Sequence, residues 1–578
     1  MHEAIPTKFF RQFEQTPILL VVYRLDIILM VDLKTLFPYK FAKNYSKPVA
    51  YFSMEFAIDQ PLKIYSGGLG FLAGSHLRSA YELKQNLIGI GILWKKGYYD
   101  QDRNQDQTLK ITFRDKDYSF LTDTNIVFPI TIHGAKVFVK AYLVKPEVFN
   151  SAPLFLLSTD IPENDYLAQT ISHRLYDPNE TTRIAQSILL GIGGAKLLDI
   201  LERKTDIYHM NEGHALPMCF YLLDKHKSLE EVRKRVVFTT HTPEKAGNEE
   251  HSIPLLNSMS FFNGLTLEQV QEYVYPENGS LNYTLTALRL AKRANAVSQL
   301  HGEVSRRMWG DYEGICKIEA ITNAQNKTYW MDEVLEKALK KNDDTALVAR
   351  KKELKRQLFR VVADQTGKLF DENVLTVVWA RRFAGYKRAN LLLHDFNRFV
   401  ALAENSKHPI QIIWAGKPYP EDFEAINIFN EIFWKTKELA NCTVVTGYEL
   451  GLSALLKKGS DIWLNNPRLY HEASGTSGMT AAMNASVNLS IPDGWVPEFA
   501  KHGKNSFIIK TAEDSLPPEI KDKTEAGNLL TILEKEIIPL YYDKPAQWNK
   551  IVKASMKDVL PQFDSGRMAD EYFTRLYK

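Results

Sequence analysis

The segment VLTVVWARRFAGYKR, residues 374–388, joins a β-branched apolar run to a strongly basic continuation. The run Val374–Ala380 favours a β-strand. Four cations follow it, namely Arg381, Arg382, Lys387 and Arg388. Since ligands of open α/β sheets bind beyond the carboxyl ends of the strands, the segment predicts a phosphate site, in which arginine binds bidentately and lysine acts as a point charge. A solvated basic surface is the alternative.

The same strand–turn–helix pattern occurs elsewhere in the chain. Further strands are expected at Val236–His241, Ile410–Ala415, Thr443–Thr446 and Asp461–Leu464. Each is followed by a glycine, proline or basic turn and then a helical stretch, which indicates repeated βα units on a mainly parallel sheet. The predicted fold class is therefore α/β, with two halves and a cleft between them.

Two long helical regions separate these units. Ile184–Leu201 predicts a buried helix in which Gly191, Gly193 and Gly194 permit the close approach of a neighbour. Met331–Phe370 is charged and helix-favouring, and a domain junction is expected near Thr322–Trp330. We therefore expect an N-terminal domain over residues 1–322 and a C-terminal domain over 323–578, whose final helices cross back.

Composition places the chain among ordinary globular proteins. Its 578 residues carry 72 Lys and Arg against 69 Asp and Glu, with 45% hydrophobic and 24% charged residues. A prior of about 150 residues per domain gives two to four domains. The near-neutral balance gives no electrostatic reason to expect a nucleic-acid partner.

Cysteine usage and the N-terminal region bear on location. Cys219, Cys316 and Cys442 are far apart, so neither a disulfide framework nor a zinc site is indicated, and we expect a reducing, cytoplasmic compartment. The apolar stretch Ile18–Leu33 is interrupted by Arg24 and Asp26. A charge near the centre of a membrane helix costs about 3 kcal/mol, so a surface or packing segment is expected and not a membrane anchor.

Two glycine-rich loops are further candidate anion sites. In YSGGLG, residues 65–70, glycines let backbone N–H groups approach an anion at a helix start, although a tight turn is the alternative. In HEASGTSGMT, residues 471–480, small residues again open a helix, and Glu472 offers a carboxylate to hydroxyl groups. A capped helix start, with Thr476 or Ser477 as the N-cap, is the alternative there.

Together these strings resemble the α-glucan phosphorylase family in its short bacterial form. The matching strings follow in the family's order: YFSMEF (51–56), IYSGGLG (64–70), NEGH (211–214), FTTHTP (238–243), LHGEVS (300–305), ITN (321–323), ARRFAGYKR (380–388), WAGK (414–417), EASGTSGM (472–479) and DGW (493–495). The resemblance thus covers roughly residues 50 to 500.

The resemblance implies two Rossmann-like domains facing across a cleft, which is the GT-B glycosyltransferase fold. It implies a glycosyltransferase (hexosyltransferase) that moves a terminal glucosyl unit from an α-1,4-glucan or maltodextrin to inorganic phosphate, giving a glucose phosphate with retained configuration. It also implies pyridoxal 5'-phosphate, whose phosphate group relays a proton to the substrate phosphate. A homodimer is left open, and neither a nucleic acid nor a membrane is an expected partner.

Carried over position by position, the resemblance assigns roles to single residues. The residues expected to bind the cofactor are Gly67, Gly68, Gly70, Arg381, Lys387, Thr476 and the residue at position 480, Thr480. Glucosyl binding falls to Glu472, Ser474, Gly475, Tyr386 and the backbone carbonyl of His241. Arg382 would hold the substrate phosphate, so that Arg382, Lys387 and His241 form the expected catalytic group.

Thr480 departs from the family pattern. The family has a lysine directly after Gly-Met, and that lysine forms the Schiff base with pyridoxal phosphate. Thr480 has no amine and cannot form the imine, and residues 481–489 contain no lysine. We expect Thr480 to point into the cleft beside the anion site. A second departure is Ala-Gln-Asn at 324–326, where the family has Gly-Val-His.

Three functions remain open from the sequence. The first is a phosphorylase that holds pyridoxal phosphate without a covalent bond or through a different lysine. The second is a retaining glucosyltransferase without pyridoxal, whose donor is a sugar nucleotide or a sugar phosphate. The third is a glucan-binding protein without catalysis, against which the retained Arg381, Arg382, Lys387 and Glu472 argue.

Overall fold

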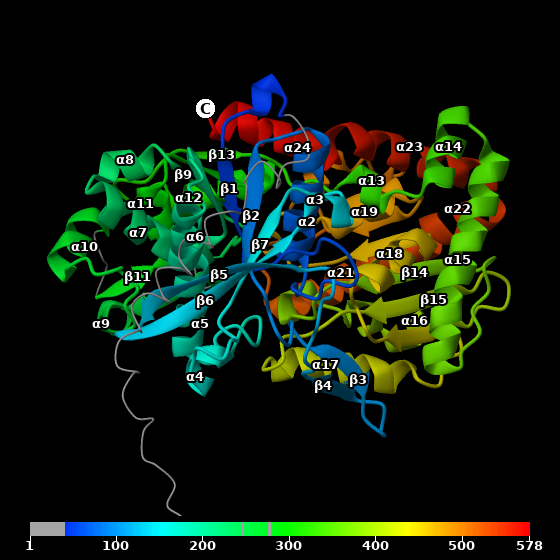
Figure 1. The fold of residues 1–578 in the computed structure, drawn as a ribbon. Coiled ribbons are helices and arrows are strands. Elements are labelled where there is room, and N and C mark those ends of the chain that lie inside the picture. Colours follow the sequence, from blue (N-terminus) through cyan, green and yellow to red (C-terminus); the bar gives the residue numbers. More distant parts are fainter. Residues whose placement is uncertain (1–40, 245–246, 275–278) are drawn as a thin grey trace, which may run out of the picture.

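The computed structural model describes residues 41–244, 247–274 and 279–578. The segment Ile18–Leu33 lies outside the described residues. In Figure 1 the first half of the chain, blue to green, forms one lobe, and the yellow and orange segments form the other. Each lobe is built around its own sheet.

The first lobe contains a nine-stranded sheet in the order β13-β12-β9-β8-β1-β2-β7-β6-β5. Its members are β1 (Val49–Phe52), β2 (Leu87–Ile92), β5 (Thr122–Ile132), β6 (Ala135–Val144), β7 (Leu154–Ser158), β8 (Ile207–Asn211), β9 (Val236–Thr239), β12 (Arg293–Ala296) and β13 (Ile318–Ala320). The pairings from β13 to β7 are parallel, whereas β5, β6 and β7 pair antiparallel. The parallel strands therefore bring their following loops to one edge.

The second lobe contains a six-stranded, wholly parallel sheet in the order β16-β15-β14-β17-β18-β19. Its members are β14 (Leu375–Ala380), β15 (Ile410–Ala415), β16 (Cys442–Val445), β17 (Ile462–Asn465), β18 (Val487–Ser490) and β19 (Ser506–Ile508). When these strands are numbered by their order in the chain, the sheet order is 3-2-1-4-5-6, which is a doubly wound arrangement. Ligands of such sheets bind where the strand order reverses. The reversal lies between β14 and β17. The predicted α/β class and Rossmann-like topology are confirmed.

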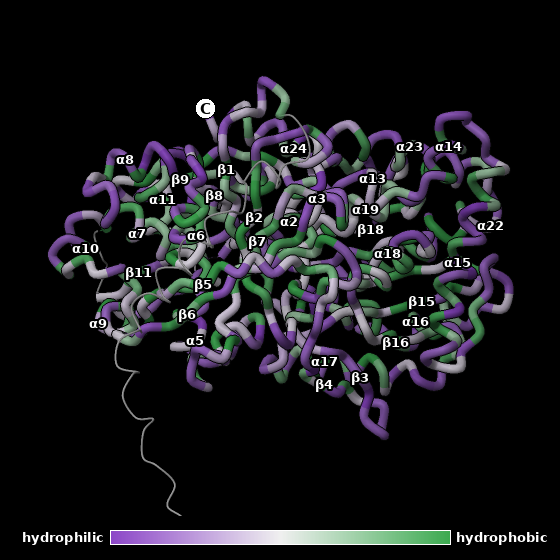
Figure 2. The backbone as a smooth tube through the Cα atoms, viewed as in Figure 1, coloured by the Kyte–Doolittle hydropathy of each residue, from purple (hydrophilic) through white to green (hydrophobic). Residues whose placement is uncertain are grey.

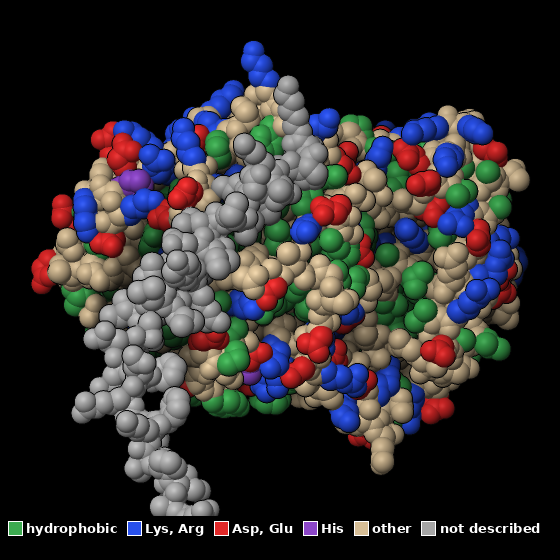
Figure 3. Space-filling model, in the orientation of Figure 1, with side chains coloured by type: hydrophobic (Ala, Val, Ile, Leu, Met, Phe, Trp, Pro, Cys, Tyr) green, Lys and Arg blue, Asp and Glu red, His purple; other side chains and the backbone are tan. Residues whose placement is uncertain are grey.

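Helices cover both sheets, and the apolar core lies between the layers. Figure 2 shows the hydrophobic residues concentrated inside each lobe and the hydrophilic ones at the periphery. The predicted helical region after residue 331 forms α14 (Glu333–Lys341) and α15 (Asp344–Thr366). On the face seen in Figure 3, positive and negative side chains are interspersed. None of the helices in the described part of the chain is both long and apolar enough to cross a bilayer.

Two segments join the lobes. The hairpin of β3 (Asp100–Arg103) and β4 (Leu109–Thr112) packs against α17 (Phe423–Thr436), and the two lie together at the bottom of Figure 1. Near the C-terminus, α24 (Ser565–Glu571) packs against α2 (Gly68–Glu82), where the hydroxyl oxygens of Ser79 and Ser565 are 2.6 Å apart. The end of the chain thus returns to the first lobe.

The predicted buried helix at 184–201 is continuous but contains a π-helical turn. It consists of α5 (Glu180–Ile188), the π-helical η3 (Leu189–Gly193) and α6 (Gly194–Ile200). A Cβ on Gly191 would lie 2.6 Å from the backbone nitrogen of Met218, and one on Gly194 would lie 2.6 Å from the Phe52 ring. The glycines therefore permit close packing, as predicted.

We expect Gly191→Ala to lower the free energy of unfolding by about 2 kcal/mol, because overpacking against backbone cannot be relieved by a side-chain rotation. Gly193→Ala is the matched control, since its Cβ would meet only side-chain carbons at 3.3 and 3.5 Å. Chemical denaturation of both variants measures the difference. Equal stabilities for the two variants would contradict the packing argument.

Candidate active site

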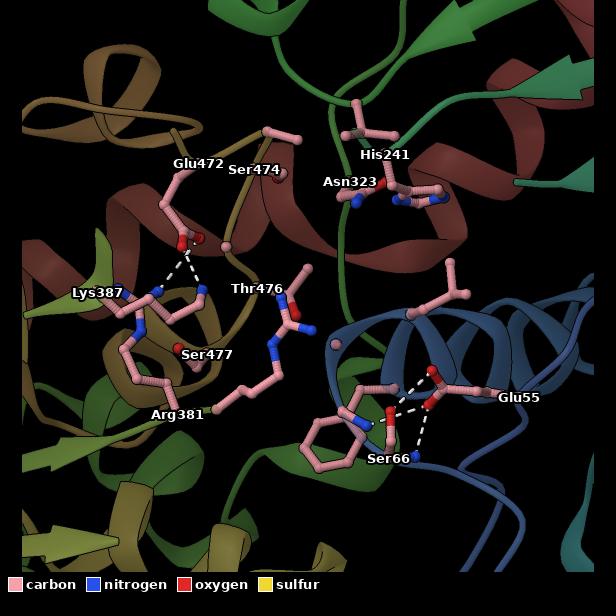
Figure 4. A pocket seen from close by; sticks show the side chains of 18 of the residues that line it. Glu55, Ser66, His241, Asn323, Arg381, Lys387, Glu472, Ser474, Thr476 and Ser477 are labelled. Carbon is pink, nitrogen blue, oxygen red and sulfur yellow. Dashed lines mark hydrogen bonds and ion pairs between the residues drawn. The ribbon is translucent and has the colours of Figure 1, made fainter. Parts of the chain in front are cut away.

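A cavity of about 320 Å³ lies between the two lobes. Loops that follow strands of both sheets line it, with residues 66–69, Phe71 and His241 from the first lobe. The second lobe supplies residues 380–387 after β14 and 471–477 after β17, the two loops at the reversal of strand order. Figure 4 shows Glu55 and Glu472 facing each other across this space. The size is at the lower end of the range for small-molecule sites.

Nearly all the predicted site residues meet in this cavity. They are Gly67, Gly68, His241, Arg381, Arg382, Tyr386, Lys387, Glu472, Ser474, Gly475 and Thr476. Gly70 and Thr480 are not on its wall. At these two positions the structure shows packing within the protein.

Gly70 is a packing residue. A Cβ at this position would lie 2.7 Å from the Cβ of Tyr65 and 3.0 Å from a carboxylate oxygen of Glu55. The glycine therefore lets helix α2 pack closely on the preceding loop. Sequence reasoning assigned it to the ligand because it belongs to the same glycine run as Gly67 and Gly68.

The expectation that Thr480 points into the cleft is wrong. Thr480 lies in α19 (Ser477–Met483), it is fully buried, and its hydroxyl donates a hydrogen bond to the Ser477 carbonyl at 3.0 Å. Helix α19 packs against α13 (Lys327–Trp330), α18 (Leu450–Gly459) and α23 (Pro545–Phe563). The short side chain is thus satisfied within its own helix.

Glu472 is the counter-charge of the basic loop. Its carboxylate pairs with Arg381 at 3.2 Å and with the Lys387 ammonium, as the dashed lines in Figure 4 show. Burial opposes the carboxylate charge, but Arg381 and Lys387 together outweigh it and lower the pKa of Glu472 to about 2. The predicted sugar ligand and two of the predicted phosphate ligands therefore neutralise one another in this structure.

Positive charge also remains available in the cavity. The Nη1 atom of Arg381 is buried and has no hydrogen-bond partner among the described residues. Arg382 lines the cavity with an exposed side chain, and no described carboxylate forms an ion pair with it. Arg388, the fourth cation of the run, is buried instead against Asp522 and Glu525. The basic loop thus divides into ligand-facing and structural cations.

The glycine loop presents the start of helix α2 to the cavity. A Cβ at Gly67 or Gly68 would meet no atom within 4 Å, so both positions leave open space. Glu55 already accepts hydrogen bonds from the backbone nitrogens of Ser66 (2.6 Å) and Gly67 (3.1 Å). The N–H groups from Gly68 onward are therefore the ones left for an anion.

Glu55, Tyr176 and Lys417 are cavity residues that were not among the predicted site residues. Glu55 holds the glycine loop and accepts a hydrogen bond from the Tyr176 hydroxyl at 2.6 Å, and Lys417 donates to the Tyr99 carbonyl at 2.8 Å. Glu55 and Lys417 lie in two of the segments that match the phosphorylase family, YFSMEF and WAGK, so the sequence did contain a signal for them. Tyr176 had no such signal.

His241 is held as a neutral imidazole. Its Nε2 lies 2.7 Å from Asn211 Oδ1, and its backbone nitrogen donates to Glu212 Oε2 at 2.7 Å. Burial, together with His301 and His214, lowers the pKa of His241 to about 3. The low pKa disfavours an imidazolium at neutral pH, and the ring nitrogen Nε2 is engaged with Asn211.

The residues present fit a phosphate group. The open space at Gly67 and Gly68, the start of a 15-residue helix and the partnerless Nη1 of Arg381 all face one cavity. Charge-assisted hydrogen bonds from arginine and backbone N–H groups are the usual ligands of phosphate in proteins.

Comparison with known proteins agrees with this geometry. The family model for carbohydrate phosphorylases matches residues 307–518. The chain is 34% identical to a maltodextrin phosphorylase of Thermococcus litoralis, over 93% of this chain and 72% of that protein. It is 32% identical to a glycogen phosphorylase of Aquifex aeolicus, over 93% of this chain and 87% of that protein. It is also 49% identical, over 92% of its length, to an uncharacterized protein of Methanocaldococcus jannaschii that it covers completely.

Proposed function

Because this chain belongs to the carbohydrate phosphorylase family, we propose that it transfers the terminal glucosyl unit of an α-1,4-glucan to inorganic phosphate. The observation that carries the proposal is the cavity between the lobes, where an unpaired arginine and a buried carboxylate–cation cluster face a helix start. The products would be a glucose phosphate and a shortened glucan. The three free cysteines support a cytoplasmic location as part of the same proposal.

Arg382 holds the substrate phosphate in this proposal. Its side chain is exposed within the cavity and carries no internal ion pair among the described residues, so binding an anion breaks no such ion pair. Charge that develops beside it during glucosyl transfer would be stabilised by a group already in position.

Glu472, with Ser474 and Gly475, binds the glucosyl hydroxyls. Ser474 Oγ is buried without a hydrogen-bond partner in the described structure, and Glu472 accepts from two cations while lying on the cavity wall. Tyr386 and the loop at His241 complete the wall around the sugar. A ligand hydroxyl would satisfy the Ser474 hydroxyl.

The family uses pyridoxal phosphate, and the phosphate-binding features fit its phosphate group. The N–H groups at the start of α2, Arg381, Lys387 and Thr476 would hold that group in this proposal. When bound, the cofactor supplies a phosphate that exchanges a proton with the substrate phosphate. Two neighbouring phosphates repel, and Arg381, Arg382 and Lys387 are the positive charges that offset this repulsion.

Incubation of the purified protein with maltoheptaose, inorganic phosphate and pyridoxal phosphate tests the proposal. We expect glucose 1-phosphate to form and the maltodextrin ladder to shorten from its non-reducing end. A parallel incubation with nucleotide-activated glucose and maltodextrin serves as the contrast. Elongation there, without glucose 1-phosphate in the first reaction, would replace phosphorolysis with glucosyl transfer from a nucleotide.

A further inference from the structure

Lys457 is a buried lysine without a polar partner. It lies on helix α18, is 1% exposed, and its ammonium forms neither a hydrogen bond nor an ion pair with any described residue. Its Nζ lies 3.8 Å from the centre of the Trp330 ring and 5.1 Å from that of Phe71. Burying an ammonium against aromatic rings costs free energy that the cation–π contacts offset only in part, which is unusual for a residue with no other role.

The aromatic neighbours place this amine beside the phosphate-binding features. Phe71 lines the cavity and lies in the first turn of α2, after Leu69 and Gly70. The Lys457 amine is not itself on the cavity wall, but it lies 5.1 Å from the centre of the Phe71 ring, which is. Three segments distant in sequence meet here, one from α2, one from α13 and one from α18.

The same neighbours place the amine beside position 480. The side-chain amide of Asn484 donates both to the Trp330 carbonyl at 2.9 Å and to the Thr480 carbonyl at 2.8 Å. Trp330 therefore lies next to both Lys457 and the residue that stands where the family has its lysine. Helices α18 and α19, which carry Lys457 and Thr480, are also in direct contact.

We propose that Lys457 supplies the amine that Thr480 lacks and bonds covalently to the aldehyde of pyridoxal phosphate. The inference rests on the proposed function, since it assumes a cavity that takes this cofactor. The Nζ lone pair attacks the carbonyl carbon, a C=N bond replaces the C=O bond, and the oxygen leaves as water. No oxidant or reductant is consumed.

The environment of Lys457 suits this reaction. Desolvation lowers the pKa of the Lys457 ammonium well below its usual range, which favours the neutral, nucleophilic form of the amine. Phe71, on the cavity wall, also offers a flat apolar surface against which a pyridine ring can pack. Two other buried lysines line the cavity, and both are already engaged: Lys387 pairs with Glu472, and Lys417 donates to the Tyr99 carbonyl and pairs with Glu449.

Borohydride trapping on the full-length protein tests the inference. The protein is incubated with pyridoxal phosphate and reduced with borohydride. Its intact mass is then measured, and the modified peptide is identified by peptide mass spectrometry. We expect one adduct per chain on the peptide that contains Lys457, and an imine absorbance band before reduction. Lys457→Met should lose both signals, whereas Lys458→Met, which changes the next lysine on the same helix, should keep them.

The fold of the variant is checked by its melting temperature. Lys457→Met replaces a buried amine by an apolar chain of similar length, so we expect a melting temperature at or above that of the parent. An adduct on another lysine, or no adduct in the parent, overturns the inference and makes Lys457 a filler of the space beside Trp330. Glucose 1-phosphate formation without a Lys457 adduct contradicts this inference alone, and a Lys457 adduct without phosphorolysis contradicts the proposed function alone.

Discussion

Arg382→Gln is expected to lower kcat/KM for phosphorolysis by roughly 10²–10³-fold, the usual effect of removing one preorganised charge from a transition state. Arg382 lines the cavity and forms no ion pair with a described carboxylate, so its full charge is available to the substrate phosphate. For the same reason the substitution should leave the free energy of unfolding nearly unchanged. The variant thus separates a functional charge from a structural one.

Initial rates at several phosphate concentrations measure this effect, and urea denaturation measures stability. Arg356→Gln is the matched control, because Arg356 is half exposed in the same lobe and pairs with Glu372 away from the cavity. Its kinetics should equal those of the parent. If Arg382→Gln retains the phosphate dependence of the parent, the substrate phosphate binds elsewhere.

Glu472→Gln is expected to abolish measurable phosphorolysis and to lower the free energy of unfolding by about 3–5 kcal/mol in phosphate-free buffer. The substitution leaves the buried Arg381 and Lys387 without their counter-charge. An anion in the cavity replaces that charge, so inorganic phosphate should stabilise this variant more than the parent. Melting temperatures with and without phosphate measure the difference, with the exposed Glu438→Gln as the control.

The stability conferred by Glu472 should also depend on pH. Because Arg381 and Lys387 lower the pKa of Glu472 from 4.5 to about 2, its contribution is present above pH 4.5 and is lost as the pH falls toward 2. The stability difference between the parent and Glu472→Gln should therefore shrink by about 2 kcal/mol between pH 5 and pH 3. A pH-independent difference would mean that the pKa of Glu472 is the same in the folded and the unfolded protein, so that Arg381 and Lys387 do not stabilise its charge.

The sequence by itself determined the elements and the loops that carry chemistry. Strand β14 and the strand at 410–415 were found within one residue, because short β-branched runs between turn residues need no distant partner to be recognised. The basic run after β14 and the small-residue loop at 471–477 were likewise identified as ligand loops. Their residue types bind anions and hydroxyl groups wherever the chain places them.

Only the tertiary structure decided how these loops meet. The 3-2-1-4-5-6 strand order puts the loop after β14 beside the loop after β17, which pairs Glu472 with Arg381 and Lys387. Local periodicity carries no information on such pairings, because the partners are 85 and 91 residues apart along the chain. The sequence therefore predicted these residues as ligands but not their mutual neutralisation.

The sequence also did not show in which direction a side chain points within its helix. Thr480 was expected in the cleft, but its hydroxyl bonds to its own helix and the contacts of α19 bury it. Lys457 had no motif at all, and its aromatic surroundings come from residues 71 and 330 on two other helices. The packing of helices that are distant in sequence determines which face of each helix is turned toward the cavity. That packing exists only in the folded chain.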